Sequence, residues 1–215
     1  MDGRGMAPTR AVEYPTRDGR PLGETDDHRN EMTDYAIQVL KDFFRPDPMT
    51  YVSGNNFIYF TEGVPADCVS PDTYVVKGVP KHDRDIFKVW EEGGHVPCFV
   101  LEVTSKYTRM EDLGDKMAKY RDILGVLDYF LFDPHRDWIS GGFRGYTLEN
   151  GIYQAIVPSP NGRLLSRALQ LELASVNRHL RFYISGSQDP LPTREEEIGR
   201  LHAELDRLRG TQGRP

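Results

Sequence analysis

The stretch Phe99-Val100-Leu101-Glu102-Val103-Thr104-Ser105 is an apolar run that carries a single carboxylate. A continuous apolar run of this length indicates a strand that is buried on both faces of a sheet. Burying an unpaired carboxylate is unfavourable, so a glutamate in such a strand normally has a cation, a metal ion or a proton beside it. Glu102 is therefore the first candidate for a functional residue.

Upstream of this strand, the sequence predicts one helix and three shorter strands. Thr25 can cap a helix whose apolar residues recur three and four positions apart, and that helix must end before Pro46. Clusters of β-branched and aromatic residues between turn formers then predict strands at residues 51–52, 57–60 and 72–76. Residues 81–94 are interpreted as a charged connection with an apolar centre.

Downstream, residues 111–124 predict a second helix, which Gly125 is suited to close. The expected apolar stripe of this helix consists of Leu113, Met117, Tyr120 and Leu124. A strand at residues 129–132 follows, and the order strand, helix, strand predicts a crossover within one mixed sheet. Asn150-Gly151 predicts a hairpin turn inside residues 144–157, whereas residues 164–184 show only short apolar pieces.

The two ends of the chain differ from this central part. Residues 1–24 are rich in glycine, proline and charge and are expected to form a flexible arm, which leaves residues 25–192 as the folded domain. In the last segment, residues 193–215, Thr193 and Glu196 have the spacing of a capping box. The expected helix has an apolar seam that can pack on its own domain or on a second copy of the chain; the seam is Ile198, Leu201, Leu205 and Leu208.

Composition narrows the class of protein. The chain has 215 residues, 38% of them hydrophobic, which fits one sizeable globular domain. It has no leader-like start and no apolar run of the roughly 18 residues that a membrane helix needs, so a soluble, cytoplasmic protein is expected. Cys68 and Cys98 lack the spacing of a metal or redox motif, and we expect both to be small, reduced core residues.

Charge argues against one mode of nucleic-acid binding. A net charge of −6 is not that of a chain whose whole surface binds nucleic acid nonspecifically, although a local basic patch is compatible with it. The best candidate for such a patch is a group of basic residues after the Glu102 strand: Lys106, Arg109, Lys116, Lys119 and Arg121.

A metal site is the functional interpretation of Glu102 that we favour. Asp72 lies on a separate predicted strand, and neighbouring strands can bring both carboxylates onto one divalent cation. Their oxygens, completed by the backbone carbonyl of Val103 and by water, suit Mg²⁺ or Mn²⁺. The alternative is that Asp72 only begins a turn after Pro71 and that Glu102 pairs with an arginine.

A lysine on the second predicted helix can complete this site. Asp112, Lys116 and Tyr120 are spaced four apart and therefore share a helix face. A lysine beside a carboxylate-bound metal can stabilise charge that develops on a phosphate. The alternative is an exposed Asp112 to Lys116 pair that contributes only about a few tenths of a kcal/mol.

Several short motifs occur in order along the chain. They are Val69-Ser70-Pro71-Asp72, Glu102-Val103-Thr104-Ser105, Asp112 with Lys116 and Tyr120, and the run from Gly125 to Pro134. In this order they resemble the Uma-two (Uma2) family of endonucleases, within the PD-(D/E)XK nuclease superfamily. The resemblance implies an α/β (α+β) fold with a restriction-endonuclease-like core, in which helices flank a mixed β-sheet. It also implies Asp72 and Glu102 as metal ligands and phosphodiester hydrolysis as the reaction. Some members of the superfamily add an acidic ligand from the first helix, for which Glu31, one turn after His28, is the candidate.

The chain departs from the superfamily pattern at one position. Thr104 stands where a lysine is expected two residues after the glutamate, so the lysine role would pass to Lys116, with Lys106 as a competitor. We therefore expect a Mg²⁺- or Mn²⁺-dependent endonuclease that acts on nucleic acid, with DNA the expected polymer, no membrane partner, and a homodimer as one expected assembly. Two alternatives stay open: a nuclease fold that only binds nucleic acid or protein, and a metal hydrolase of small phosphate esters.

Overall fold

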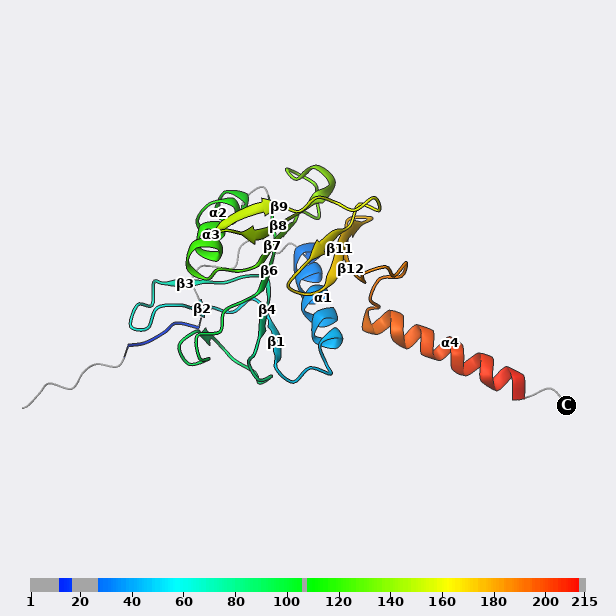
Figure 1. Ribbon diagram of the computed structural model, residues 1–215. Coiled ribbons are helices and arrows are strands. Elements are labelled where there is room, and N and C mark those ends of the chain that lie inside the picture. The colour runs from blue at the N-terminus through cyan, green and yellow to red at the C-terminus, as the bar shows by residue number, and fades with distance from the viewer. Residues whose placement is uncertain (1–11, 17–26, 106–107, 213–215) are drawn as a thin grey trace, which may run out of the picture.

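Six strands form one mixed sheet through the body of the molecule (Figure 1). The computed structural model describes residues 12–16, 27–105 and 108–212. The strand order is β1-β4-β6-β7-β8-β9, with the bounds β1 Thr50–Ser53, β4 Thr73–Lys77, β6 Phe99–Val103, β7 Asp128–Phe132, β8 Phe143–Glu149 and β9 Ile152–Ala155. β6 and β7 are parallel, whereas the other neighbours are antiparallel. The expected mixed sheet is confirmed, and the strand that carries Glu102 lies inside it.

Different helices cover the two faces of this sheet (Figure 1). α1 (Asp27–Phe43) packs on one face, where Leu101 and Val103 join its apolar residues. The other face is covered by α2 (Arg109–Leu113), α3 (Asp115–Ala118) and a π-helical turn, Lys119–Ile123. Because side chains alternate along a strand, Glu102 points to this second face.

The segment between β6 and β7 is not the single helix predicted for residues 111–124. It breaks at Gly114, where φ is −103° and ψ is −105°, and its last turn widens into the π-helix. Leu113, expected in the apolar stripe, is 38% exposed, whereas Asp112 is 2% exposed. The prediction of one continuous helix with Leu113 in its buried stripe was wrong, because polar contacts with Glu102 also decide which side of this segment is buried. Tyr120 and Leu124 of the expected stripe are buried, as predicted. Gly125 follows with a φ of +61°, as expected for a closing residue.

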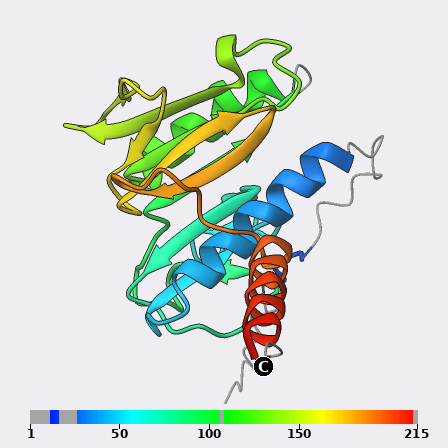
Figure 2. The same ribbon diagram turned by 90° about the vertical axis from the view of Figure 1, so that its right-hand side faces the viewer.

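A second sheet, antiparallel and three-stranded, packs against α1 (Figure 2). Its strands are β10 (Leu164–Ser166), β11 (Leu171–Val176) and β12 (His179–Ile184). The β11–β12 turn uses Asn177 and Arg178, with φ of 50° and 66°, and so lacks the glycine that usually signals a hairpin. This explains why the sequence showed only apolar pieces here, whereas the predicted Asn150-Gly151 turn between β8 and β9 is confirmed.

A third, small sheet carries the loop that leads to Asp72. It consists of β2 (Ile58–Tyr59), β3 (Cys68–Val69) and β5 (Phe87–Lys88), and β5 corrects the expectation of a plain connection over residues 81–94. The chain leaves β1 at Gly54, where a Cβ atom would lie 1.9 Å from the backbone oxygen of Asp72. The amide of Asn55 donates to the Pro71 carbonyl at 2.9 Å. Only glycine permits this close crossing, which fixes the Asp72 loop.

The last helix, α4 (Arg194–Gln212), extends away from the sheets (Figure 1). Its capping box is confirmed: the Thr193 amide donates to Glu196 Oε2 at 2.9 Å and the Glu196 amide to Thr193 Oγ1 at 3.0 Å. The apolar seam is 48% to 53% exposed at its members Ile198, Leu201, Leu205 and Leu208. Within the part of the chain that the structure describes, no helix has the length and apolar character to cross a membrane.

Residues 12–16, here called the N-terminal strap, lie against the third sheet. The Tyr14 ring centroid is 5.1 Å from that of Tyr59 and 5.3 Å from that of Trp90. The Tyr59 hydroxyl donates to the Pro15 carbonyl at 2.6 Å. This piece of the arm therefore has defined contacts, whereas residues 1–11 and 17–24, and the expected cap Thr25, lie outside the described residues.

Candidate active site

Glu102 lies at the centre of a cluster of polar side chains on the second face of the main sheet. Its side chain is 1% exposed. The Tyr120 hydroxyl donates to Glu102 Oε1 at 2.7 Å, and Lys116 Nζ donates to Oε2 at 3.0 Å. The strand therefore supplies a buried carboxylate, and the broken helical segment supplies a cation and a hydroxyl that bind it.

Two further carboxylates belong to this cluster. The Val103 amide donates to Asp72 Oδ2 at 2.7 Å, which ties the Asp72 loop to β6. Asp112 Oδ1 is 3.4 Å from Lys116 Nζ, and the Tyr129 hydroxyl donates to the Asp112 carbonyl at 2.7 Å. Glu102 and Asp112 thus share the Lys116 ammonium group, and the charge of Asp72 acts on both Glu102 and Lys116. The sequence suggested an exposed Asp112 to Lys116 pair as an alternative, but Asp112 is buried and Lys116 is 19% exposed. The spacing of these residues predicted their shared face but not the burial of Asp112.

Burial dominates the electrostatics of the cluster. It raises the pKa of Glu102 from an ordinary value of 4.5 to about 8; the Lys116 ammonium opposes this shift, and the charges of Asp72 and Asp112 add to it. Burial alone would lower the pKa of Lys116, but Glu102 and Asp112 outweigh it, so the pKa of the ammonium lies above its usual range. Lys116 is therefore charged at neutral pH, whereas the pKa of Glu102 lies close to neutral pH.

Thr104 does not take over the role of the lysine that the superfamily pattern expects. Its side chain is fully buried, its amide donates to the Phe132 carbonyl at 2.8 Å, and its hydroxyl lies 3.5 Å from that of Thr108. The ammonium beside Glu102 comes from Lys116 on α3. Lys106, the competitor considered from the sequence, lies outside the described residues.

The donor set of this cluster fits a hard divalent cation. Asp72 and Glu102 offer carboxylate oxygens, and the three carboxylates of the cluster outnumber its one cation. Among the described residues, no group of three or more His, Cys, Asp or Glu side chains is arranged to hold a metal ion. Two carboxylates are a smaller set than that, and they suit Mg²⁺, which keeps several of its waters and needs few protein ligands.

A cleft of about 540 Å³ gives access to the cluster. Lys116 and Lys119 line it from the helical segment, and Val69 and Ser70 line it beside the Asp72 loop. Its other lining residues come from the strap, the third sheet and α2: Pro15, Phe57, Tyr59, Pro65, Ala66, Cys68 and Glu111. The aromatic part of this wall was not predicted from the sequence, because Phe57 and Tyr59 fit ordinary strand positions.

Other candidate residues lie elsewhere. Glu31 is 64% exposed, is 3.6 Å from His28, and belongs to α1, which covers the face of the sheet opposite to Glu102. Neither residue therefore joins the cluster. In the expected basic patch, Lys116 and Lys119 do line the cleft, but Arg121 pairs with Asp122 at 2.7 Å.

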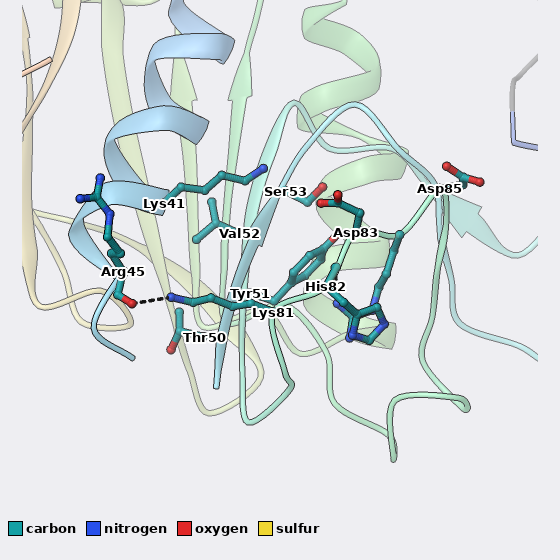
Figure 3. Close-up of a pocket in the computed structure, with 11 residues that line it drawn as sticks. Lys41, Arg45, Thr50, Tyr51, Val52, Ser53, Lys81, His82, Asp83 and Asp85 are labelled. Carbon is teal, nitrogen blue, oxygen red and sulfur yellow. Dashed lines mark hydrogen bonds between the residues drawn. The ribbon is translucent and has the colours of Figure 1, made fainter. Parts of the chain in front are cut away.

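A second hollow, of about 400 Å³, lies along the edge strand β1 (Figure 3). Figure 3 shows Lys41 extending across it and Lys81 donating to the Arg45 carbonyl, at 3.2 Å. Arg84, another basic residue of its wall, pairs with Glu92 at 2.6 Å. Because the protein itself binds much of this positive charge, and the Glu102 cluster borders the cleft, we place the candidate active site in the cleft.

Comparison with known proteins identifies the family of the chain. Residues 6–178 match the model of the Uma2 family, which is described as "Putative restriction endonuclease". The chain belongs to the Uma2 family. This confirms the resemblance that the ordered motifs indicated, and the mixed sheet between helices confirms the expected fold class. No curated protein matches the chain.

One similar solved structure comes from Anabaena variabilis ATCC 29413 and is described as a "putative nuclease belonging to DUF820". It shares 14% sequence identity with this Uma2 chain, with a TM-score of 0.47. The match covers 78% of this chain and 84% of the other.

The raised pKa of Glu102 predicts how stability depends on pH in the absence of metal. Between pH 4.5 and about 8, the folded state holds a proton that the unfolded state has released, so this residue's contribution falls as pH rises. The expected slope in the free energy of unfolding is at most about 1.4 kcal/mol per pH unit. Glu102→Gln mimics the protonated form and should lack this contribution to the pH dependence of stability. Urea unfolding in EDTA at several pH values measures it, and parallel profiles for the two proteins would contradict it.

Proposed function

We propose that this Uma2 protein is a divalent-metal-dependent endonuclease that hydrolyses phosphodiester bonds in nucleic acid, with DNA as the expected polymer. The observation that carries the proposal is the 3.0 Å contact between Lys116 and the buried Glu102, at a cleft that the same lysine lines. Membership of a family described as "Putative restriction endonuclease" supports it.

Each residue of the cluster has a role in this proposal. Asp72, Glu102 and the Val103 carbonyl would hold Mg²⁺ or Mn²⁺, which when bound neutralises charge and activates water. Lys116, which is charged and 19% exposed, stabilises negative charge that develops on a phosphate in the cleft. Tyr120 is a positioning residue, because its hydroxyl fixes one oxygen of Glu102.

A cleavage assay tests this proposal. The wild-type protein, with Mg²⁺ or Mn²⁺, should cut labelled DNA. Glu102→Gln and Lys116→Met should each lower the rate about a hundredfold or more, because each removes a group that acts on developing charge. Glu62→Gln is a matched control, since Glu62 is exposed and lies outside the cleft lining, and it should cut at the wild-type rate.

Equal cleavage by the wild type and Glu102→Gln would contradict the proposed site. Metal binding without cleavage of any nucleic acid would instead favour a protein that has kept the fold and the metal site as a binding module.

We also propose that α4 pairs with the α4 of a second copy of the chain, in parallel orientation. The exposed seam alternates in the three-and-four spacing of a coiled coil, with Ile198 and Leu205 at one core position and Leu201 and Leu208 at the other. In this register, Glu204 of one helix faces Arg209 of the other. An antiparallel pair would bring Glu204 near the same residue of its partner, so charge favours the parallel form.

Light scattering after gel filtration tests this assembly. The wild type should form a dimer whose population grows with concentration, because a seam of this length is short. The double variant Leu201→Glu and Leu205→Glu should be monomeric, whereas Ala203→Glu, on the outer side of the helix, should still dimerise. A dimer that survives in the double variant would exclude this interface.

A further inference from the structure

Glu102, the central carboxylate of the proposed site, lies below the molecular surface, whereas Asp72 is half-buried. Glu102 and Asp112 are 1% and 2% exposed, and Lys116 is the member of the cluster that lines the cleft. A phosphate that meets Lys116 must therefore enter the cleft. Duplex DNA is stiff and carries its phosphates on the outside of a wide cylinder, whereas a single strand can bend into a recess.

The N-terminal strap closes one side of this cleft. Pro15 forms part of the wall, and the hydrogen bond from Tyr59 holds its carbonyl at 2.6 Å. Tyr14 anchors the strap against Tyr59 and Trp90, and Lys88 Nζ lies 5.2 Å from the Tyr14 ring centroid. The volume of the cleft, about 540 Å³, is in the range of small-ligand pockets, about 300–1,000 Å³. We expect it to hold a short piece of one strand and not a double helix, which is a wide and stiff cylinder.

The walls of the cleft combine an aromatic ring with positive charge. Phe57 is half-buried and lines the cleft from the third sheet. Lys116 and Lys119 line it from the helical segment, where Lys119 Nζ also donates to the Cys68 carbonyl at 3.2 Å. Proteins that bind single strands use this combination, because every base can stack on an aromatic ring while the cations attract the backbone.

We propose that the cleft takes an unpaired nucleic-acid strand, with a base against Phe57 and a phosphate toward Lys119 and Lys116. The inference rests on the proposed function, since it names the form of nucleic acid that the same site accepts. A duplex then enters only where its strands are frayed, flapped or gapped.

Fluorescence anisotropy tests the inference with the full chain in EDTA, which prevents metal-dependent cleavage. The probes are a labelled DNA single strand, an RNA strand of the same sequence and the blunt DNA duplex. At least one single strand should bind about tenfold more tightly than the duplex. Phe57→Leu, which keeps apolar volume but removes the ring, should weaken that binding about tenfold. Phe57→Tyr should restore it, and Phe60→Leu, a half-buried phenylalanine outside the cleft lining, should leave it unchanged.

Duplex binding as tight as single-strand binding would overturn the inference, as would unchanged single-strand binding by a folded Phe57→Leu variant. The two proposals fail in different ways. If the protein cuts blunt duplex and Glu102→Gln abolishes this cleavage, the proposed strand preference is wrong and the proposed nuclease activity stands. If single-strand binding depends on the Phe57 ring but no cleavage occurs with Mg²⁺ or Mn²⁺, the proposed nuclease activity is wrong and the proposed single-strand site stands.

Discussion

The burial of the Glu102 carboxylate inside a strand is the constraint on which the rest of the structure depends. A charged group in this position requires compensation, which the Lys116 ammonium and the Tyr120 hydroxyl supply at 3.0 and 2.7 Å. To place both groups, the segment after β6 breaks at Gly114 and widens at Lys119–Ile123. Short π-helical turns of this kind often occur at functional sites. We therefore attribute the break and the π-helical turn of this segment to its polar contacts with Glu102.

The topology of the sheet brings these groups together. β6 and β7 are its parallel pair, and parallel neighbours need a crossover connection, which here is the segment with α2 and α3. That crossover lies over the face to which Glu102 points. At the edge of β6 that faces β4, the Val103 amide and the close crossing at Gly54 hold the Asp72 loop in place. A carboxylate from a loop, another from a strand and a lysine from the crossover thus converge beside one cleft.

The sequence predicts those features that local chemistry decides. Long apolar runs indicated β6 and β7, the capping box at Thr193 indicated the start of α4, and spacing put Asp112, Lys116 and Tyr120 on one face. It does not predict features that depend on distant contacts. β5 has two residues and forms because β2 lies beside it, and the strap is held by Tyr59 and Trp90. Leu113 is exposed although its apolar spacing predicted a buried side chain, and Asp112 is buried beside Lys116, whose ammonium binds Glu102.

Metal binding tests the proposed role of the buried carboxylate most directly. Electron paramagnetic resonance during a titration with Mn²⁺ counts the bound ions without requiring any nucleic acid. We expect one tight site in the wild-type protein, its loss in Asp72→Asn and in Glu102→Gln, and its retention in the exposed control Glu62→Gln. A tight Mn²⁺ site that persists in both cluster variants, or a wild-type protein that binds no Mn²⁺, would contradict the assignment of Asp72 and Glu102 as the metal ligands.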